Sequence, residues 1–307
     1  MGGLYKQYQY KYLGIAYAIP LFLFKIYQLL MTSCILTIIK NEHEYLDEWI
    51  KYHLDLGINH IFIFEDYDSL SHSEICNKYK NKVSLNNIFN ILDHKTQQQA
   101  KHFKLTKKIS VHHLYIKYAL SYLKKYSDIY DWCFCIDNDE FIILENNINN
   151  ILELYKDYDA FTLSWKCFGA NGLINKPDYA KKSIIEIYTK ESDISYLEKK
   201  PQEVIKTCYK LNKFNDNIFC NTHYPSNNYN WCNAINEKSY NIPIYKNIYI
   251  NHYITRSWEE YVWKVKKRGY MWGLEKNYNF FFKVNPDMNI YKEQLINNAK
   301  NISNSSI

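Results

Sequence analysis

The sequence predicts an α/β fold with a mostly parallel central sheet flanked by helices, and the first observation behind this lies near the N-terminus. Cys34–Ile39 and His60–Phe64 are short apolar runs rich in β-branched and aromatic residues, which is typical of strands buried on both faces. Between them, apolar residues recur at helical spacing from Glu44 to a helix stop at Gly57. A strand, a helix and a strand within about 30 residues form a βαβ unit, whose two strands run parallel.

The second observation is that strand-like and helix-like segments keep alternating further along the chain, as they do where helices cover both faces of a sheet. Ser257 is a helix N-cap with Glu260 at the capping-box position, and this helix ends at Gly269. The other predicted elements are, in order, a strand within Val83–Leu92, one long helix over Lys101–Lys125, a strand at Asp131–Ile136, a helix over Ile148–Tyr158, and strands at Ala160–Trp165 and Asn247–Tyr253.

Residues 31–290 are predicted to form one domain, because no internal repeat and no Pro-, Gly- or Ser-rich linker divides them. Residues 1–30 are an apolar extension, and residues 291–307 are a polar tail. The apolar run Leu13–Phe24 is shorter than the ~20 residues that a helix needs to cross a bilayer. Two interpretations of the extension stay open: a membrane anchor or interfacial segment, and a segment that packs on the domain.

The composition narrows the class of protein. With 47% hydrophobic and 23% charged residues, the chain can build a sizeable core, which excludes wholesale disorder. The net charge of +6 is scattered, which suits anionic substrates such as nucleotide diphosphates, or an anionic membrane surface, and gives no basic stripe for nucleic acid. The eight cysteines have neither a CxxC pair nor zinc spacing. They favour buried free thiols in the reducing cytoplasm; partial disulfide formation in a secretory lumen is the alternative.

Three predicted strands end in polar clusters, and these clusters indicate a binding site. They are Lys40-Asn41-Glu42, Glu65-Asp66 and Asp137-Asn138-Asp139-Glu140. The carboxyl ends of parallel strands meet at one edge, where open sheets bind their ligands, so we expect the three clusters to lie together. Asp137 and Asp139 are close enough in sequence to share one divalent cation. Mg²⁺ and Mn²⁺ prefer such oxygen ligands and bridge readily to diphosphate oxygens.

Such a site suits sugar transfer, in which the departing nucleoside diphosphate gains negative charge as the glycosidic bond breaks. A metal ion neutralises that charge, and basic side chains can assist it. Candidates for this help are Lys264, Lys266, Lys267 and Arg268. His252 is either a further ligand or a hydrogen-bonded core residue, and its spacing alone does not decide between them.

Four segments resemble, in order, the family-2-like and family-92 glycosyltransferases. They are ILTIIKNEHEYLDEWIKYHLDLGINHIFIFEDYDS at 35–69, DWCFCIDNDEFI at 131–142, SWKCFGANG at 164–172 and INHYITRSWEEYVWKVKKRG at 250–269. Tyr261 stands where the family often has Phe. The resemblance implies a GT-A fold, with a Rossmann-like nucleotide-binding half and an acceptor-binding half. It also implies a UDP- or GDP-sugar donor, a glycan acceptor, Mn²⁺ or Mg²⁺, and inversion at the anomeric carbon.

Site roles carried over from the resemblance concern the donor, the metal and the acceptor. For Lys264 and Arg268, exposure on a capped helix is the alternative to a role at the phosphates. The regions of Lys206 and His223 resemble the family more faintly. The implied assignments are Lys40, Asn41 and Glu42 to the nucleotide; Asp66 to the base or ribose; Asp137, Asp139 and His252 to the metal and diphosphate; Lys264 and Arg268 to the phosphates; and Trp165, Phe168 and Gly169 to the acceptor.

Inversion needs a carboxylate that deprotonates the acceptor hydroxyl. Glu140 is put forward as this catalytic residue beside Asp139, although it could instead brace the turn; Asp178, Glu186 and Glu203 are alternatives. Two other classes of function compete with the transferase. A metal-dependent nuclease or nucleotidyltransferase would use paired carboxylates too, together with a third carboxylate and a basic channel. A non-catalytic glycan-binding module could keep the same fold.

Overall fold

A computed structural model describes residues 31–106, 112–192, 204–215, 221–240, 243–267 and 274–301. The apolar extension at 1–30, Glu203 and Arg268 lie outside the described residues. Within the described part of the chain, no helix is both long and apolar enough to pass through a bilayer.

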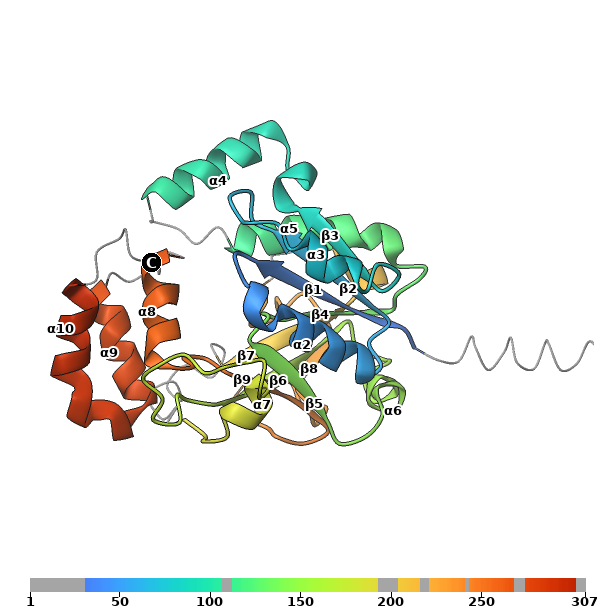
Figure 1. Ribbon diagram of the computed structural model, residues 1–307. Coiled ribbons are helices and arrows are strands. Elements are labelled where there is room, and N and C mark those ends of the chain that lie inside the picture. Colours follow the sequence, from blue (N-terminus) through green and yellow to red (C-terminus); the bar gives the residue numbers. More distant parts are fainter. Residues whose placement is uncertain are drawn as a thin grey trace, which may run out of the picture.

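A nine-stranded sheet forms the centre of the fold, with helices on both of its faces (Figure 1). The strand order is β3-β2-β1-β4-β7-β6-β9-β5, and β8 pairs with β6 beside this path. The strands are β1 (Ser33–Ile39), β2 (His60–Glu65), β3 (Val83–Asn87), β4 (Trp132–Cys135), β5 (Glu140–Leu144), β6 (Ala160–Cys167), β7 (Ile205–Lys210), β8 (Trp231–Cys232) and β9 (Ile248–His252).

Helices and strands alternate as predicted near the N-terminus, and the alternation is less regular after it. Along the chain they are α2 (His43–Asp55), α3 (Ser73–Asn77), α4 (His94–Thr106), α5 (His112–Leu123), α6 (Ile148–Glu153), α7 (Ile184–Ile187), α8 (Trp258–Lys267), α9 (Leu274–Val284) and α10 (Lys292–Asn301). Short 3₁₀ turns cover Ile88–Ile91, Lys124–Tyr126, Leu211–Lys213 and Pro286–Tyr291.

The prediction of a mostly parallel sheet is only partly right. β3, β2, β1 and β4 run parallel to one another, as the βαβ pattern requires. Beyond β4 the sheet is mixed, because β7 is antiparallel to both β4 and β6, and β5 is antiparallel to β9. β5 follows β4 after a tight turn, yet it pairs with β9 at the far end of the strand order. The turn therefore carries the chain from the parallel half into the mixed half.

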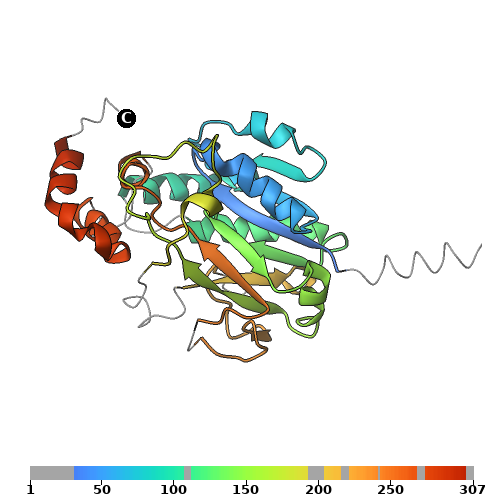
Figure 2. The same cartoon turned by 60° about the horizontal axis from the view of Figure 1, so that its bottom comes forward.

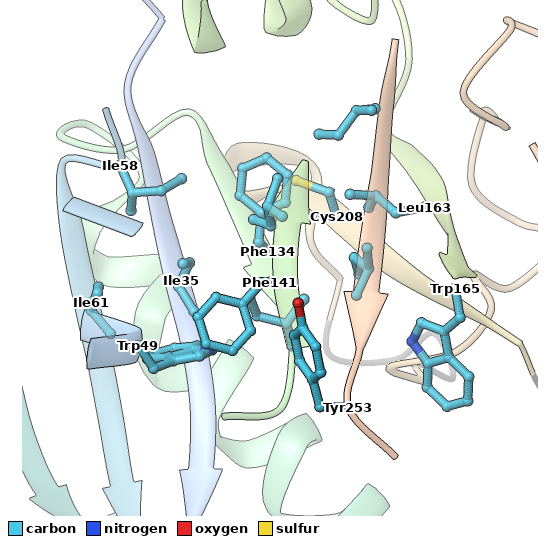
Figure 3. Close-up of a cluster of buried hydrophobic side chains, with 14 of the residues drawn as sticks. Ile35, Trp49, Ile58, Ile61, Phe134, Phe141, Leu163, Trp165, Cys208 and Tyr253 are labelled. Atoms are coloured by element: carbon cyan, nitrogen blue, oxygen red, sulfur yellow. The ribbon is translucent and has the colours of Figure 1, made fainter. Parts of the chain in front are cut away.

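Each central strand is buried on both faces, as its apolar run predicted. On β1, Ile35 and Ile39 belong to one core cluster, whereas Cys34 and Leu36 belong to the other. This alternation follows from the two-residue period of a strand. The helix α2 covers the first cluster and α5 covers the second, so the sheet is enclosed between them. Figure 3 shows part of the first cluster, where the ring of Phe141 packs 5.4 Å from that of Tyr253.

Side chains of α2 hold the first residues of β5 in place through hydrogen bonds to its backbone. The indole N–H of Trp49 donates to the carbonyl oxygen of Glu140 at 2.7 Å. The Tyr52 hydroxyl donates to the carbonyl oxygen of Ile142 at 2.8 Å, and His53 Nε2 accepts from the Ile142 N–H at 3.3 Å. Fully burying one aromatic side chain such as Trp49 contributes roughly 1.5–3 kcal/mol. The apolar face of α2, predicted from its spacing, therefore also positions the acidic turn.

Several predicted helices differ from the structure. The long helix over 101–125 is two elements, α4 and α5, on either side of residues 107–111. The predicted helix over 148–158 ends at Glu153, and only the first half of Val83–Leu92 is a strand. After β3, the Asn87 side chain accepts from the Phe89 N–H at 2.9 Å and starts a 3₁₀ turn instead.

α8, α9 and α10 pack together as a group at one end of the molecule (Figures 1 and 2). Their shared core includes Trp258, Tyr261 and Phe281, and α10 adds Leu295 and Ala299 to it. Helical structure therefore extends into the segment predicted to be a polar tail. The Ser257–Glu260 capping box at the start of α8 is confirmed, with Ser257 Oγ accepting from the Glu260 N–H at 3.3 Å and Glu260 Oε2 accepting from the Ser257 N–H at 3.2 Å.

The cysteines in the described ranges are buried and free: Cys34, Cys76, Cys133, Cys135, Cys167, Cys208 and Cys232. Burial raises the pKa of the Cys133, Cys135 and Cys208 thiols well above the usual value. These thiols are therefore uncharged members of the core.

Candidate active site

The predicted acidic cluster forms a tight turn between β4 and β5. The Glu140 N–H donates to the carbonyl oxygen of Asp137 at 3.1 Å, and the Asp137 N–H donates to Glu140 Oε2 at 3.0 Å. From β9's end, the Tyr253 N–H donates to the carbonyl oxygen of Asp139 at 3.0 Å. Hydrogen bonds from both sides thus fix the backbone of the turn, so the fold sets the directions of its carboxylates.

Asp137 is held by a buried lysine. Lys206 lies on β7 and is fully buried, and its Nζ donates to Asp137 Oδ2 at 2.7 Å. His112 Nε2, at the start of α5, lies 3.7 Å from Asp137 Oδ1. Burial opposes ionisation of Asp137, but Lys206 and His112 outweigh it and hold the pKa of this carboxyl well below its usual range. Asp137 is therefore ionised at neutral pH.

Asp139 lies among three further side chains, which come from the end of β9, from the loop after it and from α8. Lys264 Nζ donates to Asp139 Oδ2 at 3.0 Å, and Arg256 Nη2 lies 3.7 Å from the same oxygen. His252 Nε2 lies 3.6 Å from Asp139 Oδ1. Burial opposes ionisation here too, but the charge of Lys264 and the other neighbours holds the pKa of Asp139 well below its usual range. Two ionised carboxylates and several bases therefore share this edge of the sheet.

Glu140 is placed differently from the two aspartates. It is fully buried, its Oε1 lies 3.5 Å from Lys206 Nζ, and its Oε2 accepts from the Asp137 N–H. Burial, together with the nearby Asp137 and Asp139, raises the pKa of this carboxyl well above its usual value despite Lys206. This position is that of a group that braces the turn, which was the alternative to its role as the catalytic base.

The donor atoms near Asp139 can be tested against a divalent cation. Burial lowers the pKa of His252 to about 4, so the imidazole is neutral at pH 7. Its Nδ1 is buried with no hydrogen-bond partner among the described residues, while Nε2 faces the ionised Asp139. A neutral ring nitrogen and a carboxylate oxygen 3.6 Å apart suit two ligands of one cation.

Each of the two aspartates has one oxygen held by a lysine, because Lys206 donates to Asp137 Oδ2 and Lys264 donates to Asp139 Oδ2. In the described ranges, no three His, Cys, Asp or Glu side chains are grouped as a metal site. The metal set of Asp137, Asp139 and His252 therefore stays a prediction, and within it Asp139 Oδ1 and His252 Nε2 lie 3.6 Å apart.

The loops predicted to hold the nucleotide are joined to each other by an ion pair and hydrogen bonds. Lys40 Nζ pairs with Asp68 Oδ2 at 2.8 Å. Asn41 has a φ of 56°, and its Oδ1 accepts from the Leu70 N–H at 2.8 Å. The Asp66 N–H donates to the carbonyl oxygen of Ile39 at 3.0 Å. The ends of β1 and β2 thus meet at one edge, as their parallel register requires.

Glu42 is buried, whereas a residue that only lines a nucleotide site would be accessible to the ligand. It accepts a hydrogen bond from the Tyr45 hydroxyl, and its N–H donates to His72 Nε2 at 2.9 Å. His72 Nδ1 lies 2.7 Å from Glu65 Oε1. Glu42 therefore ties the first loop to the second.

The predicted acceptor residues lie on β6 and just after it. The ring centroids of Trp165 and His252 lie 4.3 Å apart, and Phe168 stacks on Tyr253 with ring centroids 5.3 Å apart. Gly169 is close-packed, since a Cβ there would lie 2.3 Å from Asn285 Oδ1. Phe168 and Gly169 are thus packing residues in this structure, and Trp165 is brought to the metal-ligand candidate His252.

Lys264, on α8, reaches the acidic turn. Lys266, two residues on, instead donates to the carbonyl oxygen of Ala299 on α10. Among the other candidate bases, Glu186 caps α7 through Ser183, and Asp178 pairs with Lys181 at 3.1 Å. Both of these carboxylates make local contacts within their own turn.

Two site residues carried no assignment from the sequence: Arg256 and His112. Arg256 stands inside a matched segment, between the strand with His252 and the cap Ser257, and only its basic charge could have drawn attention to it. His112 lay within the helix predicted over 101–125, so its place at a helix start facing Asp137 had no local signal. Lys206 has only a faint signal in the sequence, although it is the direct partner of Asp137.

Comparison with known proteins gives a weak structural likeness and no match to a protein family. No protein-family model matches the chain, and a search of curated proteins found no match. Among solved structures it is similar to HddC from Yersinia pseudotuberculosis, with a TM-score of 0.33 and 9% identity, covering 66% of this chain and 91% of that one. A likeness at that score carries no argument about fold or activity. The resemblance to family-2-like and family-92 glycosyltransferases stays a prediction.

Proposed function

We propose that the chain is a metal-dependent glycosyltransferase of the GT-A type, which transfers a sugar from a UDP- or GDP-sugar to a glycan hydroxyl, with inversion. The observation that carries the proposal is the acidic turn at the carboxyl edge of the parallel strands. Its two ionised carboxylates, Asp137 and Asp139, each have cationic side chains within 3.7 Å. This mixture suits a metal ion and a diphosphate together.

In this proposal the parallel half of the sheet holds the nucleotide. Lys40, Asn41 and Asp66 stand at the ends of β1 and β2, where open parallel sheets bind ligands. The loops that carry them are joined by the Lys40–Asp68 ion pair and by the Asn41 side chain. Preformed loops of this kind lose little conformational entropy when a nucleotide binds.

Asp139 and His252 would hold the metal ion, with Asp137 beside them. When bound, the ion supplies a Lewis acid that neutralises the departing diphosphate. Lys264 adds a fixed positive charge at the same place, because its Nζ lies 3.0 Å from Asp139 Oδ2. Fixed charges near developing negative charge stabilise a transition state without reorganisation.

The placement of Glu140 favours the transferase over the nuclease or nucleotidyltransferase. Those enzymes need a third carboxylate at the metal pair, whereas Glu140 is buried and directed to Lys206 and to the Asp137 N–H. A non-catalytic module on the same fold would bind without turnover, so hydrolysis of the donor separates it from an enzyme.

The test begins with a thermal-shift screen of UDP- and GDP-sugars, with and without Mn²⁺. The right donor raises the melting temperature by mass action. Slow, Mn²⁺-dependent hydrolysis of that donor is then measured for the wild type and for Asp139→Asn, which keeps the side-chain shape and removes the charge. We expect Asp139→Asn to lower the hydrolysis rate by about 10²-fold or more.

Asp55→Asn is the matched control, because Asp55 is an exposed carboxylate at the end of α2 that pairs with Lys51. It should keep the wild-type rate and shift. The proposal fails if no nucleotide sugar stabilises the wild type, or if Asp139→Asn hydrolyses the donor as fast as Asp55→Asn does.

A further inference from the structure

Arg256 combines two features that are unfavourable by themselves. It sits between β9 and α8 with a φ of 57°, in the left-handed region that is unfavourable for a non-glycine residue. It is also only 4% exposed, and burying a guanidinium charge is unfavourable unless the charge is well paired. The surrounding structure must therefore hold this side chain in place.

Among the described residues, the neighbours that hold Arg256 are close, but they do not use the hydrogen-bond donors of its guanidinium. Its Cζ lies 4.0 Å from the centroid of the Tyr45 ring, a cation–π contact. Its Nη2 lies 3.7 Å from Asp139 Oδ2, and its Nη1 lies 3.9 Å from Glu260 Oε1. Both distances exceed those of hydrogen bonds. In the part of the chain that the structure describes, the guanidinium donates no hydrogen bond, although it carries five N–H donors.

Glu260 is already occupied by other donors, which explains the longer distance. The Tyr188 hydroxyl and Ser257 Oγ each donate to Glu260 Oε2 at 2.7 Å, and the Tyr179 hydroxyl donates to Oε1. Glu260 therefore attracts Arg256 through its charge while its oxygens are bonded to hydroxyls. The guanidinium is buried, fixed by a ring and two carboxylates, and still has uncommitted donors.

The choice of arginine at this position is notable against the composition. Arg256 and Arg268 are the two arginines among 38 basic residues, so lysine is the default cation of this chain. The planar guanidinium fork differs from an ammonium chiefly in that it matches two oxygens of a phosphate or carboxylate at once. In a chain whose cations are almost all lysines, the residue beside Asp139 at this point is an arginine.

We infer that Arg256 binds the diphosphate of the nucleotide donor, through two parallel N–H···O bonds, next to the cation held at Asp139. This inference rests on the proposed function and deepens it by naming the residue that recognises the diphosphate. Lys264 supplies a point charge at the same oxygen of Asp139, Oδ2, whereas the guanidinium of Arg256 presents its N–H donors in a fixed planar geometry. Tyr45, Glu260 and the tyrosines behind it are positioning residues for the guanidinium.

Because the chain has two arginines, the wild-type protein can report on Arg256 directly. Protein labelled with ¹⁵N-arginine gives two Nε–Hε signals, and Arg256→Lys assigns them. We expect addition of UDP or GDP with Mg²⁺, which unlike Mn²⁺ is diamagnetic and does not broaden nearby signals, to shift the Arg256 signal, and addition of the matching nucleoside with Mg²⁺ to leave it unshifted. The shift itself is measured in the wild type, and the variant serves only to assign the two signals.

Affinity gives the second measurement. Arg256→Lys keeps the charge and loses the fork, so the Kd for the nucleoside diphosphate should rise about tenfold or more, as for the loss of a charge-assisted bond. The Kd for the matching nucleoside should stay within about twofold. Lys51→Arg, on the exposed pair with Asp55, is the control and should bind like the wild type.

The outcomes separate the two proposals. If the wild type binds a nucleoside diphosphate with Mg²⁺ but the Arg256 signal stays still and Arg256→Lys binds equally well, the inference is overturned and the glycosyltransferase proposal stands. If the wild type binds no nucleoside diphosphate under any of these conditions, both are overturned.

Discussion

At the scale of single residues, the buried imidazole of His53 makes stability depend on pH. Its Nδ1 bonds the carbonyl oxygen of Trp49 at 2.9 Å and its Nε2 accepts from the Ile142 N–H, so the ring packs neutral between α2 and β5. Burial lowers its pKa from 6.5 to about 3. Between these two values the unfolded chain binds a proton that the folded protein does not. The stabilisation is therefore complete above pH 6.5 and is lost as pH falls toward 3.

We expect the free energy of unfolding to fall through this group by up to about 1.4 kcal/mol per pH unit below pH 6.5. In His53→Gln, whose amide can still accept from Ile142, the slope of this free energy between pH 6.5 and 4.5 should be shallower by that amount. Urea unfolding at several pH values measures it. His94→Gln, on the exposed surface of α4, is the control and should keep the wild-type slope; equal slopes in both variants would show that His53 does not titrate as stated.

At the scale of elements, Asn285 joins three segments that lie far apart in the chain. Its Oδ1 accepts from the Ala170 N–H at 2.6 Å, and its Nδ2 donates to Thr255 Oγ1 at 3.1 Å and to the carbonyl oxygen of Phe281 at 2.9 Å. The close approach leaves no room for a side chain at residue 169. The end of α9, the loop after β6 and the loop before α8 are thereby locked together.

Gly169→Ala should therefore destabilise the protein by about 1–3 kcal/mol, the range for overpacking a well-packed site. Gly172→Ala is a useful comparison, because Gly172 has a φ of 75° but no atom within 4 Å of an added Cβ. That variant carries backbone strain alone, of about 1 kcal/mol. Thermal or urea unfolding ranks the two; a cost at Gly169 no larger than that at Gly172 would contradict the steric account.

At the scale of the whole molecule, Lys206 connects the parallel and mixed halves of the sheet. It lies on β7, and its ammonium reaches Asp137 at the end of β4 and Glu140 at the start of β5. Lys206→Met would leave two carboxyl groups of a buried network without their cation. Breaking a buried pair in this way costs about 3–5 kcal/mol.

Lys210→Met makes the same change on the same strand. Lys210 is only half-buried and donates to the carbonyl oxygen of Lys156 at 2.6 Å, so its loss should cost about 1 kcal/mol. Denaturant unfolding compares the two variants. Equal stabilities would mean that Lys206 does not hold the two halves together.

The parallel half of this molecule could be predicted from the sequence, because each of its signals is local. The apolar runs of β1 and β2 and the spacing of α2 suffice for a βαβ unit, and its register brings Lys40 and Asp66 to one edge. The acidic turn was found for the same reason, as Asp137 directly follows an apolar strand. The Ser257 cap was also readable, since a capping box is a four-residue pattern.

The mixed half and the partners in the site could not be predicted, because they depend on contacts between distant residues. Nothing near Lys206 in sequence indicates that β7 runs antiparallel beside β4, which is what brings its ammonium to Asp137. Arg256 reaches Tyr45 and Asp139 through tertiary packing alone. The burial of Glu140 likewise follows from α2 packing on β5.

The pairing of β5 with β9 has a consequence for how errors in folding would appear. Glu140 lies directly opposite His252 in this antiparallel pair, and β5 ends the strand order of the sheet. A slip of one residue along β9 would turn every side chain of that strand to its other face, and would carry the imidazole away from Asp139. Such a misregistered molecule would keep its helices and most of its hydrogen bonds, and would look native by circular dichroism while lacking the contact between His252 and Asp139.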